Sequence, residues 1–389
     1  MGYRKFAADY MFTGYEMLGK DAVLITDENG RVNAIADAAD VGDNIERFNG
    51  ILCPGFINCH CHLELSHLKG KIPPKTGMVK FLLTVMSERF ISESEIEQAI
   101  QFEEQFMQEK GIVAVGDICN TTHTLNLKRS SDLFFHNFIE ATGFTESSAE
   151  LRFRQARDVY DKFVDEWSSS SIVPHSPYSI SEALFRLIDQ HEASSLLSIH
   201  NQESEAEAEF FAYASGGFLE LYRSLKIDVG HFSPKPHSSL IHCLSHLGPS
   251  HSLILVHNVH TRQSDFDWIA ENNRTNLHWC LCPNANLYIN DRLADVELLR
   301  KNQANIVIGT DSLASNIQLN VLEELKTLQS NYPHFETSEL LTWATINGAD
   351  ALRISKKYGS FEKGKRPGIV VIHGGKYDKL DGTISRRVL

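Results

Sequence analysis

The chain has 389 residues, of which 42% are hydrophobic and 22% charged, and this balance excludes a disordered chain without a core. The formal net charge of −13 argues against nucleic-acid or membrane-surface partners, because both are polyanions. Seven cysteines in a chain of this size do not indicate a disulfide scaffold. We find no secretory signal, myristoylation site or membrane-spanning apolar run, so we expect a cytoplasmic protein.

Both ends of the chain have the character of β structure. Residues 21–37 place two strand-like runs on either side of Asn29 and Gly30, which is a hairpin signal. Residues 364–380 have the same composition. We therefore predict a small composite β domain formed by residues 1–52 and 360–389, beside a second domain of residues 53–359.

Between these ends, strand-like and helix-like segments alternate. The predicted strands are Gly55–His62, Ile112–Asn120, Leu133–Gly143, Ser171–Ser179, Leu196–Glu203, Ser252–His260, Thr275–Pro283 and Asn305–Ser312. The predicted helices are Gly77–Arg89, Ser94–Lys110, Glu150–Trp167, Ser181–Ser194, Asp265–Asn272, Asp295–Gln303, Asn320–Asn331 and Glu339–Arg353. Such alternation implies an α/β fold with parallel strands, and eight strands match a closed (β/α)8 TIM-like barrel. The irregular stretch Gly216–His251 is expected to be an insertion at the active-site rim.

Histidine is abundant, with 18 residues, and two of them stand at the end of the first predicted barrel strand. His60 and His62 are two residues apart, so their side chains share one face of that strand. Barrel active sites lie at this end of the strands. The two imidazoles are therefore half of a zinc site, or else two polar residues on a partly exposed edge.

Three other predicted strands end in residues that can bind a metal. His200 ends the apolar run of the fifth predicted strand, with Glu203 three residues later, and His257 and Asp311 end the apolar runs of the sixth and eighth. Such residues are costly in a barrel interior unless they are paired or bound to metal, so their recurrence is difficult to attribute to chance. We expect the next acidic residues to form the solvated face of a helix: Glu205, Glu207 and Glu209.

In this order, PGFINCHCHLE, PHSPYS, IHNQE, LVHNVH, CPNAN and GTDSLASN resemble the amidohydrolase superfamily. They are most similar to its mononuclear deaminases of S-adenosylhomocysteine, methylthioadenosine, guanine, cytosine and aminofutalosine, and to triazine hydrolases. The resemblance covers residues 22–373 and implies a (β/α)8 barrel beside a composite β-sandwich made from both termini. It also implies one divalent metal, Zn²⁺ or else Fe²⁺ or Mn²⁺, with four ligands: His60, His62, His200 and Asp311.

The same resemblance implies roles around the metal. Glu203 matches the acid/base, His257 matches the histidine that orients the hydroxide or the substrate, and Asp311 can also accept the proton of the water. His175, Asn286 and Asn316 match family positions at or near the substrate. Because Glu64 and His67 follow His62, and His123 follows Asn120, we expect these three to line the entrance and to affect substrate choice. Glu140 is either a further metal ligand or a structural or substrate-facing carboxylate.

These inferences predict an aminohydrolase. A metal lowers the pKa of bound water to ~7, so a metal-bound hydroxide can deaminate a heterocyclic amine. We expect an adenine-type nucleoside, such as aminofutalosine, because HLELS resembles a stretch of aminofutalosine deaminases. Alternatively, the same hydroxide hydrolyses a cyclic amide, an imidazolone or a triazine, or the chain is a catalytically silent scaffold. A homodimer is the family-level expectation.

Overall fold

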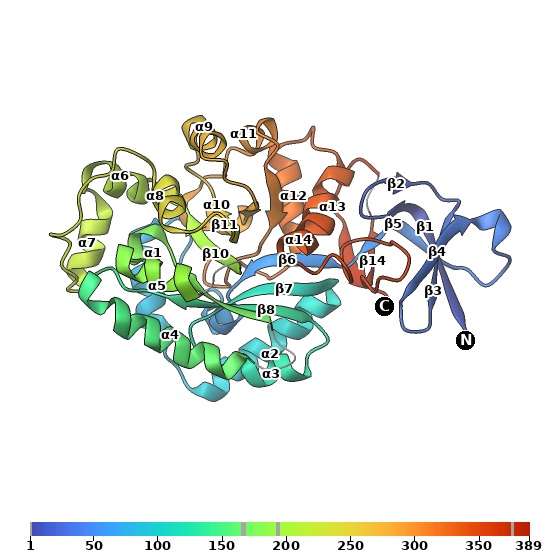
Figure 1. The fold of residues 1–389 in the computed structure, drawn as a ribbon. Helices are drawn as coiled ribbons and strands as arrows, with labels where there is room; N and C mark the ends of the chain where they lie inside the picture. The colour runs from blue at the N-terminus through green and yellow to red at the C-terminus, as the bar shows by residue number, and fades with distance from the viewer. Residues whose placement is uncertain (1, 165–168, 192–194, 375–376) are drawn as a thin grey trace.

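The computed structural model describes residues 2–164, 169–191, 195–374 and 377–389 (Figure 1). Figure 1 shows two regions: a sheet at one end of the molecule and a larger body in which helices surround parallel strands. Both chain ends lie on the side of the sheet. Among the described residues, we find no helix with the length and apolarity that crossing a membrane requires.

The terminal sheet combines strands from both ends of the chain, as predicted. Its order is β15-β14-β5-β1-β3-β4, and β2 pairs with β1. These strands are β1 (Tyr3–Phe12), β2 (Met17–Leu18), β3 (Ala22–Asp27), β4 (Val32–Asp37), β5 (Glu46–Pro54), β14 (Ile369–His373) and β15 (Ile384–Arg387). The predicted hairpin is confirmed, since β3 and β4 pair in antiparallel fashion around Gly30, which has a φ of 78°. The exact boundaries of the two domains stay a prediction.

The larger body contains two four-stranded parallel sheets. The first consists of β6 (Phe56–Cys61), β7 (Ile112–Cys119), β8 (Phe134–Ala141) and β9 (Ser169–Pro174). The second consists of β10 (Leu196–Asn201), β11 (Ser252–His257), β12 (Leu277–Leu281) and β13 (Asn305–Ile308). Every predicted barrel strand is thus confirmed, but each ends earlier than predicted. One reason is that Gln202, Asn258 and Asp311 have positive φ values, which turn the chain out of the extended conformation.

Backbone hydrogen bonds join the two parallel sheets at both edges. The N–H of His200 donates to the carbonyl of His175 at 3.0 Å, which ties β10 to the end of β9. The N–H groups of Thr310 and Asp311 donate to the carbonyl of His60 at 3.0 and 3.1 Å, which ties the loop after β13 to β6. This connectivity is the one that the predicted closed barrel requires.

Helices lie between and around the strands, and most of them were predicted. They are α1 (Met78–Glu88), α2 (Glu93–Glu109), α3 (Leu125–Ser130), α4 (Ala149–Phe163), α5 (Glu182–His191), α6 (Glu205–Tyr213), α7 (Gly217–Ser224), α8 (Ser239–His246), α9 (Gln263–Glu271), α10 (Pro283–Asn290), α11 (Val296–Lys301), α12 (Val321–Asn331), α13 (Thr337–Ala344) and α14 (Ile346–Ala351). Two predicted helices reach into 165–167 and 192–194, which lie outside the described residues.

Two predictions about helices are wrong. The stretch 216–251 is not simply irregular, because it contains α7 and α8. Apolar residues of α7, including Phe218 and Leu221, are buried in a hydrophobic cluster, and the Ser238 side chain caps α8. The predicted helix Glu339–Arg353 is instead two helices, since Thr345 has φ −128° and ψ −89°, outside the helical region.

Candidate metal centre and the cavity above it

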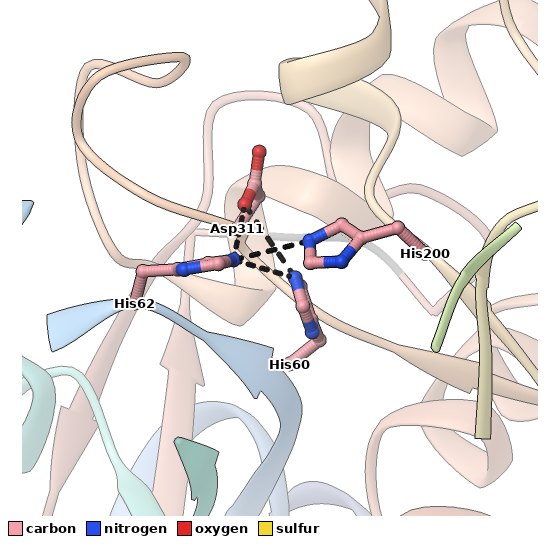
Figure 2. Close-up of side chains that lie close together, drawn as sticks. All are labelled: His60, His62, His200 and Asp311. Carbon is pink, nitrogen blue, oxygen red and sulfur yellow. Dashed lines mark hydrogen bonds and ion pairs between the residues drawn. The ribbon is translucent and has the colours of Figure 1, made fainter. Parts of the chain in front are cut away.

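Four side chains meet where the barrel strands end (Figure 2). His60 lies in β6, His62 directly follows it, His200 lies in β10, and Asp311 lies in the loop after β13. The Nε2 atom of His62 is 3.2 Å from the Nε2 atoms of both His60 and His200. The Oδ1 atom of Asp311 is 3.5 and 3.4 Å from the Nε2 atoms of His60 and His62. The fold thus brings together the four residues that the sequence predicted as metal ligands.

This group fits a divalent cation. The four ligand atoms lie within 4.8 Å of one another, and all four residues are buried. Tetrahedral zinc with bonds of about 2.0–2.1 Å to imidazole nitrogen would place its ligand atoms about 3.3 Å apart. The observed separations of 3.2–3.5 Å are close to this value. Three imidazoles and one carboxylate also suit iron or manganese.

Hydrogen bonds behind the group orient two of its members. The Nδ1–H of His200 donates to the carbonyl oxygen of His175 at 2.9 Å, which leaves Nε2 as the free ligand atom. The Ser315 hydroxyl donates to Oδ2 of Asp311 at 2.6 Å, while Oδ1 faces the histidines. Asp311 also has a φ of 57°, a conformation that costs free energy and commonly occurs at functional sites.

His257 stands beside the group with the opposite tautomer. The side-chain amide of Asn286 donates to His257 Nδ1 at 3.0 Å, so a neutral imidazole carries its proton on Nε2. That Nε2 atom lies 3.4 Å from Oε1 of Glu203. A protonated nitrogen cannot bind a metal, but it can donate a hydrogen bond. Asn286 is not among the described residues that line the cavity, and it orients His257 through this hydrogen bond; its predicted place near the substrate stays a prediction.

Glu203 lies in the loop after β10, buried beside His257. Burial raises its pKa well above the ordinary value, and the negative charges of Asp311 and Glu207 raise the pKa further. The carboxyl group therefore holds a proton more tightly than an exposed glutamate does. This property suits a residue that donates a proton at neutral pH.

Burial lowers the pKa of the neighbouring imidazoles, whereas it raises the pKa of Glu203. It lowers the pKa of His62 to about 4, with a contribution from His60, and it lowers the pKa of His257 to about 3. Burial also lowers the pKa of His200. These imidazoles are therefore neutral at pH 7, which is the state in which histidine binds a metal.

A cavity of about 410 Å³ opens above the group, a size that suits a small-molecule ligand. Its inner end is lined by polar residues, among them His62, His200, Glu203, His257 and Asp311. Its outer wall is mostly apolar, and its largest part comes from α1 and the region of α7, with Met78, Phe81, Leu82, Val85, Met86, Leu221, Tyr222, Leu225 and Ile227. Residues around Phe144 and two cationic side chains, Arg89 and Arg152, also line it. The predicted insertion therefore does border the cavity, although it is helical.

Glu140 and His175 form a pair on the cavity wall. The Nδ1 atom of His175 is 2.8 Å from Oε1 of Glu140, and the side-chain amide of Asn120 donates to Oε2 at 3.0 Å. Burial opposes ionisation of Glu140, but His175 holds the pKa of this carboxyl below its usual range. Glu140 approaches His200 at Nδ1 (3.4 Å), on the side opposite the converging Nε2 atoms. It therefore supports the ligands from behind and does not join them.

Two residues predicted to contact the substrate are engaged elsewhere. Glu64 accepts a hydrogen bond from the Thr121 hydroxyl at 2.7 Å. The side-chain amide of Asn316 donates to the Thr310 carbonyl at 2.9 Å and to Oε1 of Glu324 at 2.8 Å. Neither residue is among the described residues that line the cavity. Asn316 thus braces the loop that carries Asp311.

The two histidines expected at the entrance are also set back from it. The Nε2 atom of His67 lies 3.0 Å from the carbonyl of Arg89, and Nδ1 of His123 lies 3.0 Å from the Thr121 hydroxyl. Neither is among the described residues that line the cavity. A role of His67 or His123 in substrate choice stays a prediction.

One of the glutamates predicted to face solvent does not. Glu205 and Glu209 are exposed as expected, but Glu207 is fully buried behind Glu203. A buried carboxylate and an exposed one have the same sequence pattern on a helix, so periodicity alone could not distinguish them. The available signal was Ser204 three residues before Glu207, a spacing typical of a helix start.

Comparison with protein families agrees with this geometry. A family model described as the amidohydrolase family matches residues 51–386. An adenosine deaminase of Helicobacter pylori is 27% identical over 338 residues, which cover 83% of this chain and 79% of that protein.

Comparison with solved structures finds deaminases that have a similar fold. The structure of Helicobacter pylori aminofutalosine deaminase in complex with methylthio-coformycin has a TM-score of 0.82 and 22% identity, and the match covers 99% of this chain and all of that chain. An adenosine deaminase of Xanthomonas campestris with bound zinc has a TM-score of 0.75 and 19% identity, with 98% and 89% coverage.

Proposed function

This chain belongs to the amidohydrolase family, and from that premise we propose that it removes the exocyclic amine of an adenine-type nucleoside. It is a metal-dependent hydrolase that acts on carbon–nitrogen bonds. The observation that carries the proposal is the convergence of three imidazole Nε2 atoms and one carboxylate oxygen beside a buried glutamate. The proposed ligands are His60, His62, His200 and Asp311.

Deamination adds water to the carbon that carries the amine, and three residues divide the work. When bound, a divalent metal lowers the pKa of a coordinated water to ~7 and so supplies the nucleophile at neutral pH. The carboxylate of Asp311 accepts the proton that the water loses. Glu203, which enters the reaction protonated, gives its proton to the ring nitrogen. The amine then takes the proton held by Asp311 and leaves as ammonia, while the Glu203 carboxylate takes the proton of the new hydroxyl group, which becomes the carbonyl. The Nε2–H of His257 donates a hydrogen bond that orients the attacking oxygen.

The cavity supports a nucleoside with an apolar 5′ substituent. Its polar inner end would hold the purine, while the apolar side chains of α1 and α7 would cover the substituent. The related Helicobacter pylori structure, which holds methylthio-coformycin, supports this class of substrate. Among adenine-type nucleosides we propose aminofutalosine as the substrate; its 5′ substituent is an apolar chain and ring that ends in a carboxylate, and Arg89 and Arg152 also line the cavity. The Xanthomonas campestris structure supports zinc as the metal.

The variant Glu203→Gln tests the assignment of the proton donor. Because Glu203 is not one of the four proposed ligands, this variant is expected to keep one metal per chain. It should lose turnover by about 100-fold to 10,000-fold, the usual contribution of general acid–base catalysis. Metal content and ammonia release are measured on the same sample. Wild-type ammonia release by the variant would overturn the role of Glu203.

A further inference from the structure

Glu207 is a fully buried carboxylate that the reaction outlined above does not use. It lies in the first turn of α6, which begins directly after the loop that carries Glu203. Burial raises its pKa to about 7, so keeping an acidic group here has a free-energy cost. Such a group is expected to be held by specific partners.

The Glu207 carboxylate is held by two consecutive backbone N–H groups of this loop and by one hydroxyl group. Oε2 of Glu207 accepts a hydrogen bond from the N–H of Glu203 at 3.1 Å, and Oε1 accepts one from the N–H of Gln202 at 3.1 Å. The Ser239 hydroxyl donates to Oε1 at 2.5 Å. One carboxylate thus binds two consecutive amides, one of which belongs to the proposed proton donor.

This arrangement differs from ordinary helix capping. In a capping box, the glutamate bonds to the N–H of the N-cap residue, here Ser204. The hydroxyl of Ser204 does accept a hydrogen bond from the N–H of Glu207 at 3.3 Å. The carboxylate, however, extends past Ser204 to residues 202 and 203. It therefore acts on the loop more than on the helix.

The loop needs such support because its backbone is strained. Gln202 has a φ of 48°, in the left-handed region that non-glycine residues adopt at a cost. Its side chain is also fixed: Nε2 donates to Oδ2 of Asp265 at 3.1 Å, and Oε1 accepts from the Thr261 hydroxyl at 2.7 Å. These contacts hold the Gln202 side chain, whereas Glu207 holds the two amides.

We propose that Glu207 is a positioning residue for the deamination, which fixes the backbone of residues 202–203 and thereby aims the Glu203 carboxyl at the inner end of the cavity. The inference rests on the proposed function, because Glu207 acts on the reaction only through Glu203. It assigns no contact between Glu207 and the substrate or the metal. The loss of Glu207 should therefore change the chemical step and leave ligand binding intact.

The variant Glu207→Gln tests this directly. A glutamine side chain keeps the size but presents an NH₂ group to one of the two backbone amides, so one hydrogen bond is lost. We expect kcat per bound metal to fall by about 10-fold to 100-fold, the effect usual for residues that support catalytic ligands. KM should stay within about twofold, and the metal content should remain one per chain. The matched control is Ser239→Ala, which removes a partner of the same carboxylate but neither amide bond, and which should keep kcat within about threefold.

Amide hydrogen exchange gives a readout that does not depend on turnover. In the wild type, the amides of Gln202 and Glu203 should exchange slowly, and in Glu207→Gln they should exchange at least about tenfold faster. The amides of β10 serve as the internal reference, and their exchange should not change. A role in stability alone would accelerate exchange across α6 and β10 together and leave kcat per bound metal unchanged.

The outcomes separate this inference from the proposed function. Wild-type kcat per bound metal in Glu207→Gln, or fast exchange of residues 202–203 in the wild type, overturns the positioning role. The wild-type exchange measurement decides even when the variant does not fold. The protein could release no ammonia from any nucleoside and still protect these two amides only when Glu207 is present. In that case the proposed function fails, but the hydrogen bonds from Glu207 to the backbone of residues 202–203 are confirmed.

Discussion

The two ends of the cavity are built by different means. The inner end consists of buried polar side chains from strand ends, and hydrogen bonds to neighbours such as Ser315 and Asn286 fix their atoms. The outer wall consists of apolar side chains from α1 and α7, several of which are only partly buried. From this difference we expect the reaction to depend on the positions of a few polar atoms at the inner end, and substrate choice to depend on the outer wall.

The largest effect is expected from removing a ligand at the inner end. Asp311→Asn replaces the only anionic member of the four-residue group and should abolish tight metal binding. We expect at least about a 1,000-fold loss of ammonia release, because the nucleophile depends on the metal. Metal analysis after dialysis and a coupled ammonia assay measure both effects. In the control Ser315→Ala, the carboxylate remains and the metal should be retained; an Asp311→Asn protein with full metal and full activity would contradict the assignment.

A smaller effect is expected from the residue that sets the tautomer of His257. Asn286→Asp keeps the size, but its carboxylate can only accept, so it would draw the imidazole proton to Nδ1. His257 Nε2 would then lose its donor function, and we expect kcat to fall by about 10-fold to 100-fold. The change in kcat at constant metal content is the measurement. Unchanged turnover in this variant would show that the tautomer of His257 is irrelevant to the reaction.

Substitutions in the outer wall of the cavity are expected to change KM. Leu82→Asn introduces a polar group where we expect the apolar substituent to lie, so KM for a 5′-substituted nucleoside should rise about tenfold with little change in kcat. Leu83→Asn is the matched control, since Leu83 lies on the same helix and is partly buried but is not among the described residues that line the cavity. Equal effects of the two substitutions would contradict the assignment of this wall to substrate binding.

The smallest expected effect is on the free energy of unfolding, through Glu324, which supports the loop that carries Asp311 at the inner end of the cavity. Glu324 accepts hydrogen bonds from Asn316 and Asn284, and burial raises its pKa to about 8. The folded state therefore binds this proton more tightly than the unfolded state. Stability from this group is complete below the ordinary pKa of 4.5 and is lost as the pH rises through about 8.

Comparison with Glu324→Gln isolates this contribution. The free energy of unfolding of the wild type, relative to the variant, should decrease between pH 5 and pH 8, because the variant has no group to ionise there. Urea unfolding at four pH values across this range measures the difference. A difference that stays constant with pH would show that Glu324 ionises normally in the folded protein.

The sequence was sufficient to predict the positions of site residues that lie at the ends of strands. Alternation puts His60 and His62 on one face, and parallel strands bring His200, His257 and Asp311 to the same end of the barrel. No comparable rule covers helices and loops. Asn286 in α10 contacts His257, and Asn316 in the loop after β13 contacts Glu324 in α12. No local pattern encodes these contacts between distant segments.

The missed features have the same cause. Glu207 has the spacing of a solvent-facing residue, but it is buried and contacts other segments, among them α8 through the Ser239 hydroxyl. The helices α7 and α8 are eight residues long each, so their apolar periodicity was too short to be detected. Features that depend on contacts between distant segments therefore could not be predicted from local sequence.

The most direct test of the account is the ammonia released by the metal-loaded wild-type protein. Candidate substrates are adenosine, methylthioadenosine, 5′-deoxyadenosine and aminofutalosine, with a halotriazine and a cyclic amide as the competing class. We predict one ammonia per nucleoside consumed for at least one adenine nucleoside, together with the absorbance change from adenine to hypoxanthine. No ammonia from any adenine nucleoside, with hydrolysis of the triazine or the cyclic amide, would contradict the account.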